Sequence, residues 1–331
     1  MKKSGITFLF IIIALIFCVP WYMGIIKMRL MTEVLYYGLF AVSLGLVTGY
    51  GGKVSFGHAA YFGIGAYTTA LALLHIQNMG VISTLILSGL VAGILGAFFS
   101  IFLVRVSGTY YAMLTMAFGQ LVYGVALKWR SVTRGDDGLG GFALPPIDIP
   151  FLGSIELIKT SNLYWFTMAV VGLLYLVVWH ITRTSLGVSI ILLRENEDRA
   201  KFIGHNTSST RFMLFTISSV LAGVSGGLFA LFQGFVSTGS LDIVKSLDCV
   251  IMLMIGGMNH LLGPLAGSLF IVFVGDWLSD LTVAWEFYIG IVFIAMMLFF
   301  RGGLVSIIQG LVNNLKTIRV RNVRNQEEVK S

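Results

Sequence analysis

The segment from Leu193 to Asn206 reads LRENEDRAKFIGHN and is dense in charge. Six of its eight residues from Arg194 to Lys201 are charged, in a chain where 11% of residues are. On a helix, Glu197 and Lys201 stand four residues apart in the order that favours an ion pair. Gly204 follows where a helix would end. The spacing predicts a short amphipathic helix whose charged face docks on another protein.

A second pair at the same spacing, Glu195 and Arg199, supports this helix. The alternative is a solvated connector whose charges only set the orientation of the chain in a membrane, since surface ion pairs are common and weak. Neither interpretation assigns a catalytic role to this segment.

Nucleotide chemistry has no sequence support. The chain lacks the G-x-x-x-x-G-K-[ST] pattern that cradles nucleotide phosphates, and the nearest match, Gly51 to Val54, has valine in place of the Mg²⁺-binding hydroxyl. We therefore expect that the chain binds no cofactor and is not an enzyme, and that a partner supplies the energy for any active process.

Metal and redox sites are also unsupported. The five histidines are dispersed, and Cys18 and Cys249 lie far apart within apolar runs. His58 is the one candidate proton carrier, with a packed histidine as the alternative. The chain shows no cluster of polar residues suited to catalysis, so a membrane-embedded enzyme ranks third, behind a transport subunit and an ion-coupled secondary carrier.

The composition is that of a protein embedded in a lipid bilayer. Of its 331 residues, 57% are hydrophobic and 39 are glycine, with a mean hydropathy of +0.90. Apolar runs of about 20 residues recur, each long enough to cross a bilayer as a helix. The predicted fold class is all-α: a polytopic membrane protein of about ten transmembrane helices, with glycine-broken half-helices. The predicted spans are Ile6 to Ile26, Glu33 to Tyr50, Phe56 to Ile76, Val81 to Val104, Thr109 to Leu127, Asn162 to Ile181, Phe212 to Phe235, Val283 to Phe300, and two within Val244 to Leu278.

The ends of the chain can be oriented by charge. The first apolar run is expected to remain as a span, because no A-x-A-like cleavage site follows it. Ten spans with both termini in the cytoplasm place 15 of the 22 basic residues on the cytoplasmic side, although Lys27 and Arg29 oppose this. Residues 1–305 then form a transmembrane permease domain with a cytoplasmic loop at 182–211 and an external loop at 128–161. The basic tail, 306–331, meets anionic lipid.

Four segments resemble, in order and approximate spacing, the permeases of branched-chain amino acid ABC transporters, the LivM-type inner-membrane subunits. They are GYGGKVSFGHAAYFGIG from Gly49, TRGDDGLGG from Thr133, RENEDRAKFIGHN from Arg194 and GGMNHLLGPLAG from Gly256. Together the matching blocks extend over most of the chain.

The resemblance implies a transport complex. Its members pair with a second, related permease, two ATPase subunits that bind ATP and Mg²⁺, and an extracytoplasmic substrate-binding protein. Their cargo is leucine, isoleucine or valine, with urea and short amides in sister groups, and transport is by alternating access. The charged segment resembles the loop that inserts into a cleft on the ATPase. The residues carried over to this role are Arg194, Glu195, Asn196, Glu197, Asp198, Ala200 and Gly204, whereas Arg199 stands where alanine is more usual.

The two glycine-rich blocks predict broken helices that line a gated pathway, with Ser55 capping the second half-helix of the first block. Close helix packing is the alternative. If the gate is correct, leucine at Gly57 or Gly263 abolishes uptake without loss of assembled protein. The pathway candidates are Gly52, Ser55, Gly57, His58, Gly257, Gly263 and Pro264. In the external loop, Arg134, Asp136 and Asp137 are candidates for docking the binding protein, with a solvated loop as the alternative.

Overall fold

The computed structural model describes residues 24–76, 79–149, 153–299 and 302–306. Six helices within these ranges are long and apolar enough to cross a membrane, judged by length and composition. Shorter helices lie between them, and the described strands have two or three residues each. The all-α polytopic class is therefore confirmed. The six are α2 (Ile25–Gly45, continued as a π-helix, η1, through Leu46–Tyr50), α4 (Val81–Leu103), α5 (Thr109–Lys128), α7 (Thr160–Ile181), α10 (Thr207–Gln233) and α12 (Gly263–Leu281).

Both predicted glycine breaks separate helices. The first lies between η1 and α3 (His58–His75), and the second lies between α11 (Ile243–Gly256) and α12, followed by α13 (Trp285–Phe299). Proline stands in the first turn of α12, where its missing N–H costs no helical hydrogen bond.

The start of the second predicted span was wrong. The helix α2 begins at Ile25 rather than Glu33 and includes Lys27 and Arg29 in its first turns. The Arg29 guanidinium lies 5.6 Å from the centre of the Phe232 ring, so the neighbouring helix accommodates this charge. The first predicted span and most of the tail lie outside the described residues, so the count of ten spans stays a prediction.

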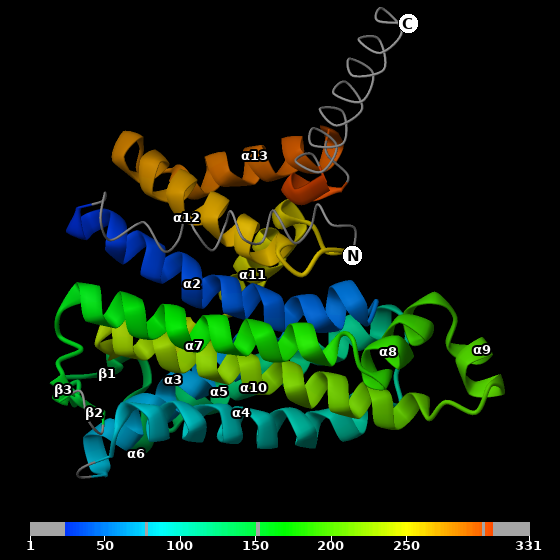
Figure 1. Ribbon diagram of the computed structural model, residues 1–331, viewed down its shortest axis with the longest axis horizontal. Helices are drawn as coiled ribbons and strands as arrows, with labels where there is room; N and C mark the ends of the chain where they lie inside the picture. The colour runs from blue at the N-terminus through cyan, green and yellow to red at the C-terminus, as the bar shows by residue number, and fades with distance from the viewer. Residues whose placement is uncertain (1–23, 77–78, 150–152, 300–301, 307–331) are drawn as a thin grey trace, which may run out of the picture.

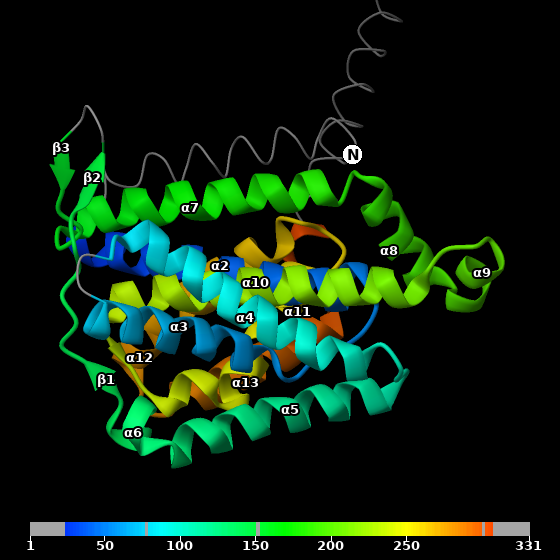
Figure 2. The ribbon, with the colours of Figure 1, turned by 90° about the horizontal axis from the view of Figure 1, so that it is seen from below.

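Short elements gather at the two ends of the helices (Figures 1 and 2). At one end lie α8 (Ser185–Glu195) and α9 (Glu197–Phe202). At the other lie β1 (Leu139–Gly140), β2 (Ile147–Ile149), β3 (Gly153–Ile155), α6 (Arg130–Thr133) and the 3₁₀ turn η2 (Gly135–Asp137). Here β1 pairs antiparallel with β4 (Phe235–Val236), just after α10, and β2 pairs with β3. The 3₁₀ turn η3 (Thr238–Leu241) follows β4.

The helix α10 is at the centre of the packing and contacts α2, α3 and α4. Its glycines allow the backbones to approach closely. A Cβ on Gly226 would overlap the Phe62 carbonyl, and one on Gly65 of α3 would overlap the backbone of Gly223. Small residues at such crossings are the usual means by which membrane helices pack, since lipid gives apolar side chains no reason to associate.

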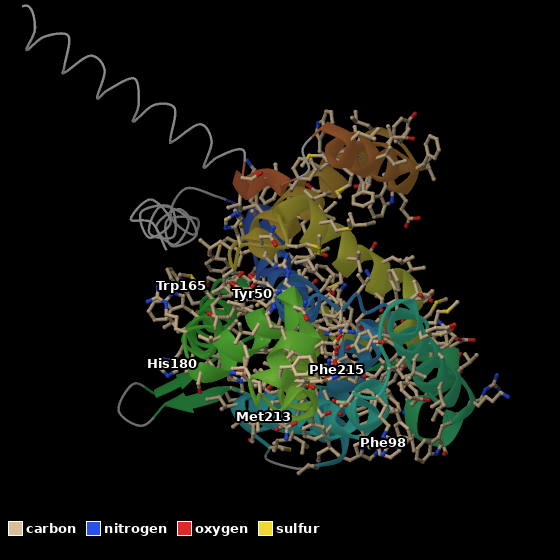
Figure 3. The ribbon with its side chains drawn as sticks, turned by 90° about the vertical axis from the view of Figure 1, so that its right-hand side faces the viewer. Tyr50, Phe98, Trp165, His180, Met213 and Phe215 are labelled. Atoms are coloured by element: carbon tan, nitrogen blue, oxygen red, sulfur yellow. The ribbon has the colours of Figure 1, made fainter. Side chains whose placement is uncertain are left out.

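Buried hydroxyls add hydrogen bonds between these helices. Ser225 of α10 donates to the Tyr36 carbonyl of α2 at 2.6 Å, and Ser268 of α12 donates to the Val34 carbonyl at 3.0 Å. Seen from the α8–α9 end, Phe215 lies among the helices while Phe98 and Met213 lie on the outer surface (Figure 3). The helices are therefore joined by buried hydrogen bonds, and apolar side chains cover much of the outer surface.

Candidate functional site

The charged segment folds as two helices rather than one. Asn196 has an extended backbone, with φ −161° and ψ 107°, so α8 ends at Glu195 and α9 starts at Glu197. The Asn196 side chain caps α9 by accepting a hydrogen bond of 2.9 Å from the Arg199 N–H. The predicted pair of Glu195 and Arg199 was therefore wrong, because an extended residue separates them. The predicted pair of Glu197 and Lys201 is confirmed, at 3.0 Å.

The end of α9 has the predicted glycine stop. Gly204 has φ +87° and its N–H donates to the Lys201 carbonyl, while the His205 N–H donates to the Ala200 carbonyl. These two bonds form a Schellman motif, which needs the left-handed conformation that glycine adopts freely. Ala200 is buried, whereas Phe202 and Ile203 are 91% and 65% exposed. The segment therefore ends in an exposed apolar pair, here named the apolar tip.

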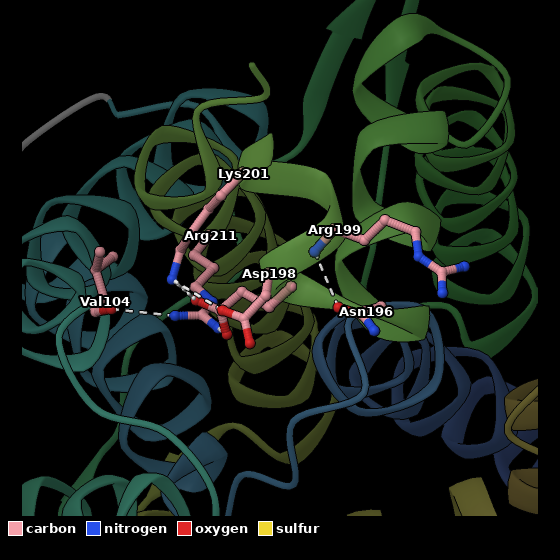
Figure 4. Close-up of polar contacts among 7 residues, drawn as sticks. Val104, Asn196, Asp198, Arg199, Lys201 and Arg211 are labelled. Carbon is pink, nitrogen blue, oxygen red and sulfur yellow. Dashed lines mark hydrogen bonds and ion pairs between the residues drawn. The ribbon is translucent and has the colours of Figure 1, made fainter. Parts of the chain in front are cut away.

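An arginine from α10 holds α9 in place. Arg211 pairs with Glu197 through one terminal nitrogen, and the other donates to the Val104 carbonyl at the end of α4 at 3.2 Å (Figure 4). Burial disfavours the ionised Glu197, but the hydrogen bond from Lys201 and the charge of Arg211 outweigh it, so its pKa is lowered. Asp198 points outward and lies 3.9 Å from Lys201.

A second link connects α8 to both glycine breaks. Arg194 donates to the Asn259 side chain of the late break at 2.9 Å. A Cβ on Gly52 of the first break would lie 2.9 Å from the Arg194 Cγ, and one on Gly49 would overlap the Met258 carbonyl. Three segments far apart in sequence thus meet at one place, which we name the junction: residues 49–57, 194–204 and 256–263.

Ser55 and His58 form a buried chain of hydrogen bonds. The helix α3 has Gly57 at its N-cap position without a side-chain cap, so the predicted capping by Ser55 was wrong. Ser55 Oγ instead lies 3.1 Å from His58 Nδ1, and His58 Nε2 lies 2.7 Å from Ser218 Oγ. Ser218 gives its one proton to the Ser43 carbonyl, so His58 Nε2 must be the donor in its bond to Ser218. Both ring nitrogens therefore have partners inside the protein, since Nδ1 lies beside the Ser55 hydroxyl, and this favours a packing role.

The other pathway candidates make close backbone contacts. A Cβ on Gly57 would overlap the Thr115 carbonyl, and one on Gly263 would overlap the Gly257 carbonyl. Gly257 itself has φ +112°, a region that favours glycine, and Pro264 lies in the first turn of α12. Leucine at Gly57 or Gly263 would therefore disturb helix packing, which corrects the expectation that assembly would be spared. Their role as a gate stays a prediction.

The docking candidates lie at the opposite end. Arg134 and Asp137 are exposed, and Arg134 has the left-handed conformation. Asp136 accepts a hydrogen bond of 3.0 Å from Thr238, beyond β4. This contact shows how the loop is held but not what it binds, so docking stays a prediction.

Sequence reasoning missed two residues at the α8–α9 end, Arg211 and Asn259. Arg211 counted only as a basic residue before a span, and Asn259 only as part of a glycine-rich block. A charged residue directly before an apolar run was the available signal for Arg211; nothing local singled out Asn259.

Within the described ranges, no three His, Cys, Asp or Glu side chains gather in a way that could hold a metal ion.

Comparison with known proteins identifies the family of the chain. The sequence profile of the family described as "Branched-chain amino acid transport system / permease component" matches residues 26–301. The chain belongs to this family. The permease is 26% identical over 322 residues to the high-affinity branched-chain amino acid transport system permease protein LivM of Escherichia coli K12, covering 90% of this chain and 74% of LivM. The LivM of Salmonella typhimurium matches to the same extent.

A more distant relative carries another name. The autoinducer 2 import system permease protein LsrC of Escherichia coli is 26% identical to this permease over 218 residues, covering 63% of this chain and 61% of LsrC. No solved structure matched the chain. The family is that of ABC transporter permease subunits, so this permease is a multi-pass membrane subunit of such a transport complex.

Proposed function

We propose that this permease moves leucine, isoleucine and valine into the cell, driven by ATPase subunits that contact it through α8 and α9. The observation that carries the proposal is the junction. An exposed apolar tip, Phe202 and Ile203, stands on a segment whose base is tied to both glycine breaks. The charged face beside the tip includes Asp198 and the Glu197–Lys201 pair.

The contacts of Arg211 and of the junction could pass a displacement of α8 or α9 to the transmembrane helices. A partner that displaces α9 would pull Arg211 and, through it, the end of α4. Displacement of α8 would pull Arg194 and, through it, Asn259 in the loop before α12. Packed interfaces respond to such shifts as rigid bodies, which is the motion that alternating access needs.

The proposed complex has further members. A second related permease completes the pathway, two ATPase subunits bind ATP and Mg²⁺, and an extracytoplasmic binding protein delivers the cargo. In the proposed orientation both termini and α9 face the cytoplasm, while residues 128–161 face outward. The Arg134, Asp136 and Asp137 surface of that loop is the proposed dock for the binding protein.

The first experiment is co-purification. The permease is tagged at its C-terminus and extracted gently from its native membrane, and the partners are identified for wild type and a Glu197→Lys, Gly204→Pro double variant. The double variant reverses the charge that faces Arg211 and removes the glycine stop, so we expect it to lose the ATPase and keep the second permease. Asp136→Asn, at the opposite end, is the control and should retain the ATPase. An ATPase retained by the double variant would overturn the role of α9.

The second experiment identifies the cargo. Uptake of radiolabelled leucine is measured in vesicles that hold the complete complex, with and without ATP, and in the presence of an ionophore. We expect ATP-dependent uptake that survives the ionophore and is competed by isoleucine and valine. Collapse with the ionophore would indicate an ion-coupled carrier. Competition by urea or short amides alone, or by autoinducer 2, would reassign the cargo.

A further inference from the structure

A small cavity lies where five segments of the described chain meet near the junction. It measures about 20 Å³, enough for one water-sized occupant and far too small for an amino acid. Most of its lining is apolar, including Phe215, which Figure 3 shows among the helices. The polar side chains in the lining include Lys53, Ser100 and Arg211.

Two of these side chains have hydrogen-bond donors that no described residue satisfies. Ser100 is fully buried, and its hydroxyl has no partner, whereas Ser88 on the same helix donates to the Leu85 carbonyl at 2.8 Å. Arg211 uses both terminal nitrogens, but its buried Nε has no partner among the described residues. Buried donors left without partners are costly, so an occupant that satisfies both would stabilise the fold.

The charge around the cavity is positive. Arg211 shares Glu197 with Lys201, which leaves the Lys53 ammonium without an ion pair among the described residues. Lys53 lies 6.0 Å from the centre of the Tyr111 ring. Burial first, and then the charge of Arg211, lower the pKa of Lys53, in part offset by Glu197. A negative charge in the cavity would offset both effects, because it favours the protonated ammonium.

We propose that this cavity binds one small monovalent anion, such as chloride, held by Lys53, Ser100 and Arg211. Lysine and arginine only donate, so the site suits an occupant that only accepts. A water molecule also has two donors of its own, and the mostly apolar lining offers few acceptors for them. The anion would join α8 and α10 to the end of α4 and to the segment 47–53, beside the junction. The site is independent of the proposed cargo and of the partner subunits.

The test is the thermal midpoint of the purified full-length chain as gluconate is replaced by chloride at constant ionic strength. We expect a saturable rise with chloride and with bromide. Ser100→Ala and Lys53→Gln should each weaken the apparent affinity about tenfold, the size expected for losing one hydrogen bond to a charged group. Ser88→Ala, a buried serine on the same helix, is the matched control and should keep the wild-type response.

Each outcome decides the proposal. No anion dependence in wild type would mean that water alone fills the cavity, and would overturn it. A response kept by both Ser100→Ala and Lys53→Gln would place the anion elsewhere and would also overturn it. If a variant fails to fold, bromide soaked into wild-type crystals gives an anomalous signal, and its presence or absence beside Arg211 settles the site.

Discussion

The two ends of the helical body are held by different kinds of contact. At the α8–α9 end, side chains make the links: Arg211 to Glu197, and Arg194 to Asn259. At the opposite end a backbone pairing is added, since β1 pairs with β4 and ties Leu139 and Gly140 to the strand that follows α10, beside the side-chain bond from Thr238 to Asp136. A segment held by a few side-chain links can move as a unit when a partner binds, whereas a strand pair resists such motion. The comparison predicts that the first end transmits force and the second stays fixed.

The largest difference between the two ends is expected on removing Arg211, which links α9 to α4. Arg211→Ala leaves Glu197 with Lys201 alone and frees the Val104 carbonyl, so α9 loses its link to α4. We expect transport per ATP hydrolysed to fall about 10- to 100-fold, the range of typical coupling energies. Uptake and ATPase rates of the reconstituted complex give this ratio. Arg105→Ala, at an exposed arginine just after α4, is the control; an unchanged ratio in Arg211→Ala would show that force does not pass through it.

A glycine at the opposite end should affect stability instead. Gly138 has φ +69°, and a Cβ there would lie 2.6 Å from the Phe235 ring of β4. Gly138→Ala should cost about 1 to 3 kcal/mol through strain and lower the thermal midpoint, while the transport-to-ATPase ratio stays normal. Gly141→Ala, with φ +78° and open space around it, has the strain without the clash and should cost less. A changed ratio in Gly138→Ala would count against a fixed outer end.

The smallest expected effect is a pH dependence at α9. The pKa of Glu197 is lowered below its ordinary value of 4.5, so the stability it contributes is present above that value and lost as the pH falls through the folded-state pKa. The pair is partly exposed, so the effect should be below about 1 kcal/mol. Thermal midpoints of wild type and Glu197→Gln should therefore converge at acid pH. Parallel curves down to about pH 3 would contradict it, because Glu197 would then titrate alike in both states.

Local chemistry allowed parts of the junction to be predicted. Gly204 and the Glu197–Lys201 pair depend on residues within one helical turn, and both were placed correctly. The two helix breaks followed from glycine and proline, which disrupt helices wherever they fall. The extended Asn196 was not foreseen, because asparagine is compatible with both a helix and a cap, and the neighbouring charges favoured continuation.

Contacts between distant residues were beyond this reasoning. Arg194 and Asn259 are separated by 65 residues, and the pairing of Leu139 with Val236 joins a loop to the end of a helix much later in the chain. Periodicity says which residues are apolar but not which helices adjoin, since lipid and protein interior are equally apolar environments.

The membrane class, the helix breaks and the resemblance to a permease family could be inferred from the amino-acid sequence, because each depends on composition or on residues close together in the chain. The folded chain was needed to show that the two breaks meet α8, that Arg211 holds α9, and that Lys53, Ser100 and Arg211 line one cavity. The physical reason is that these contacts join residues far apart in the chain and depend on how the helices pack, which includes close backbone approach at glycine. That packing fixes which side chains face each other, and no local pattern encodes it.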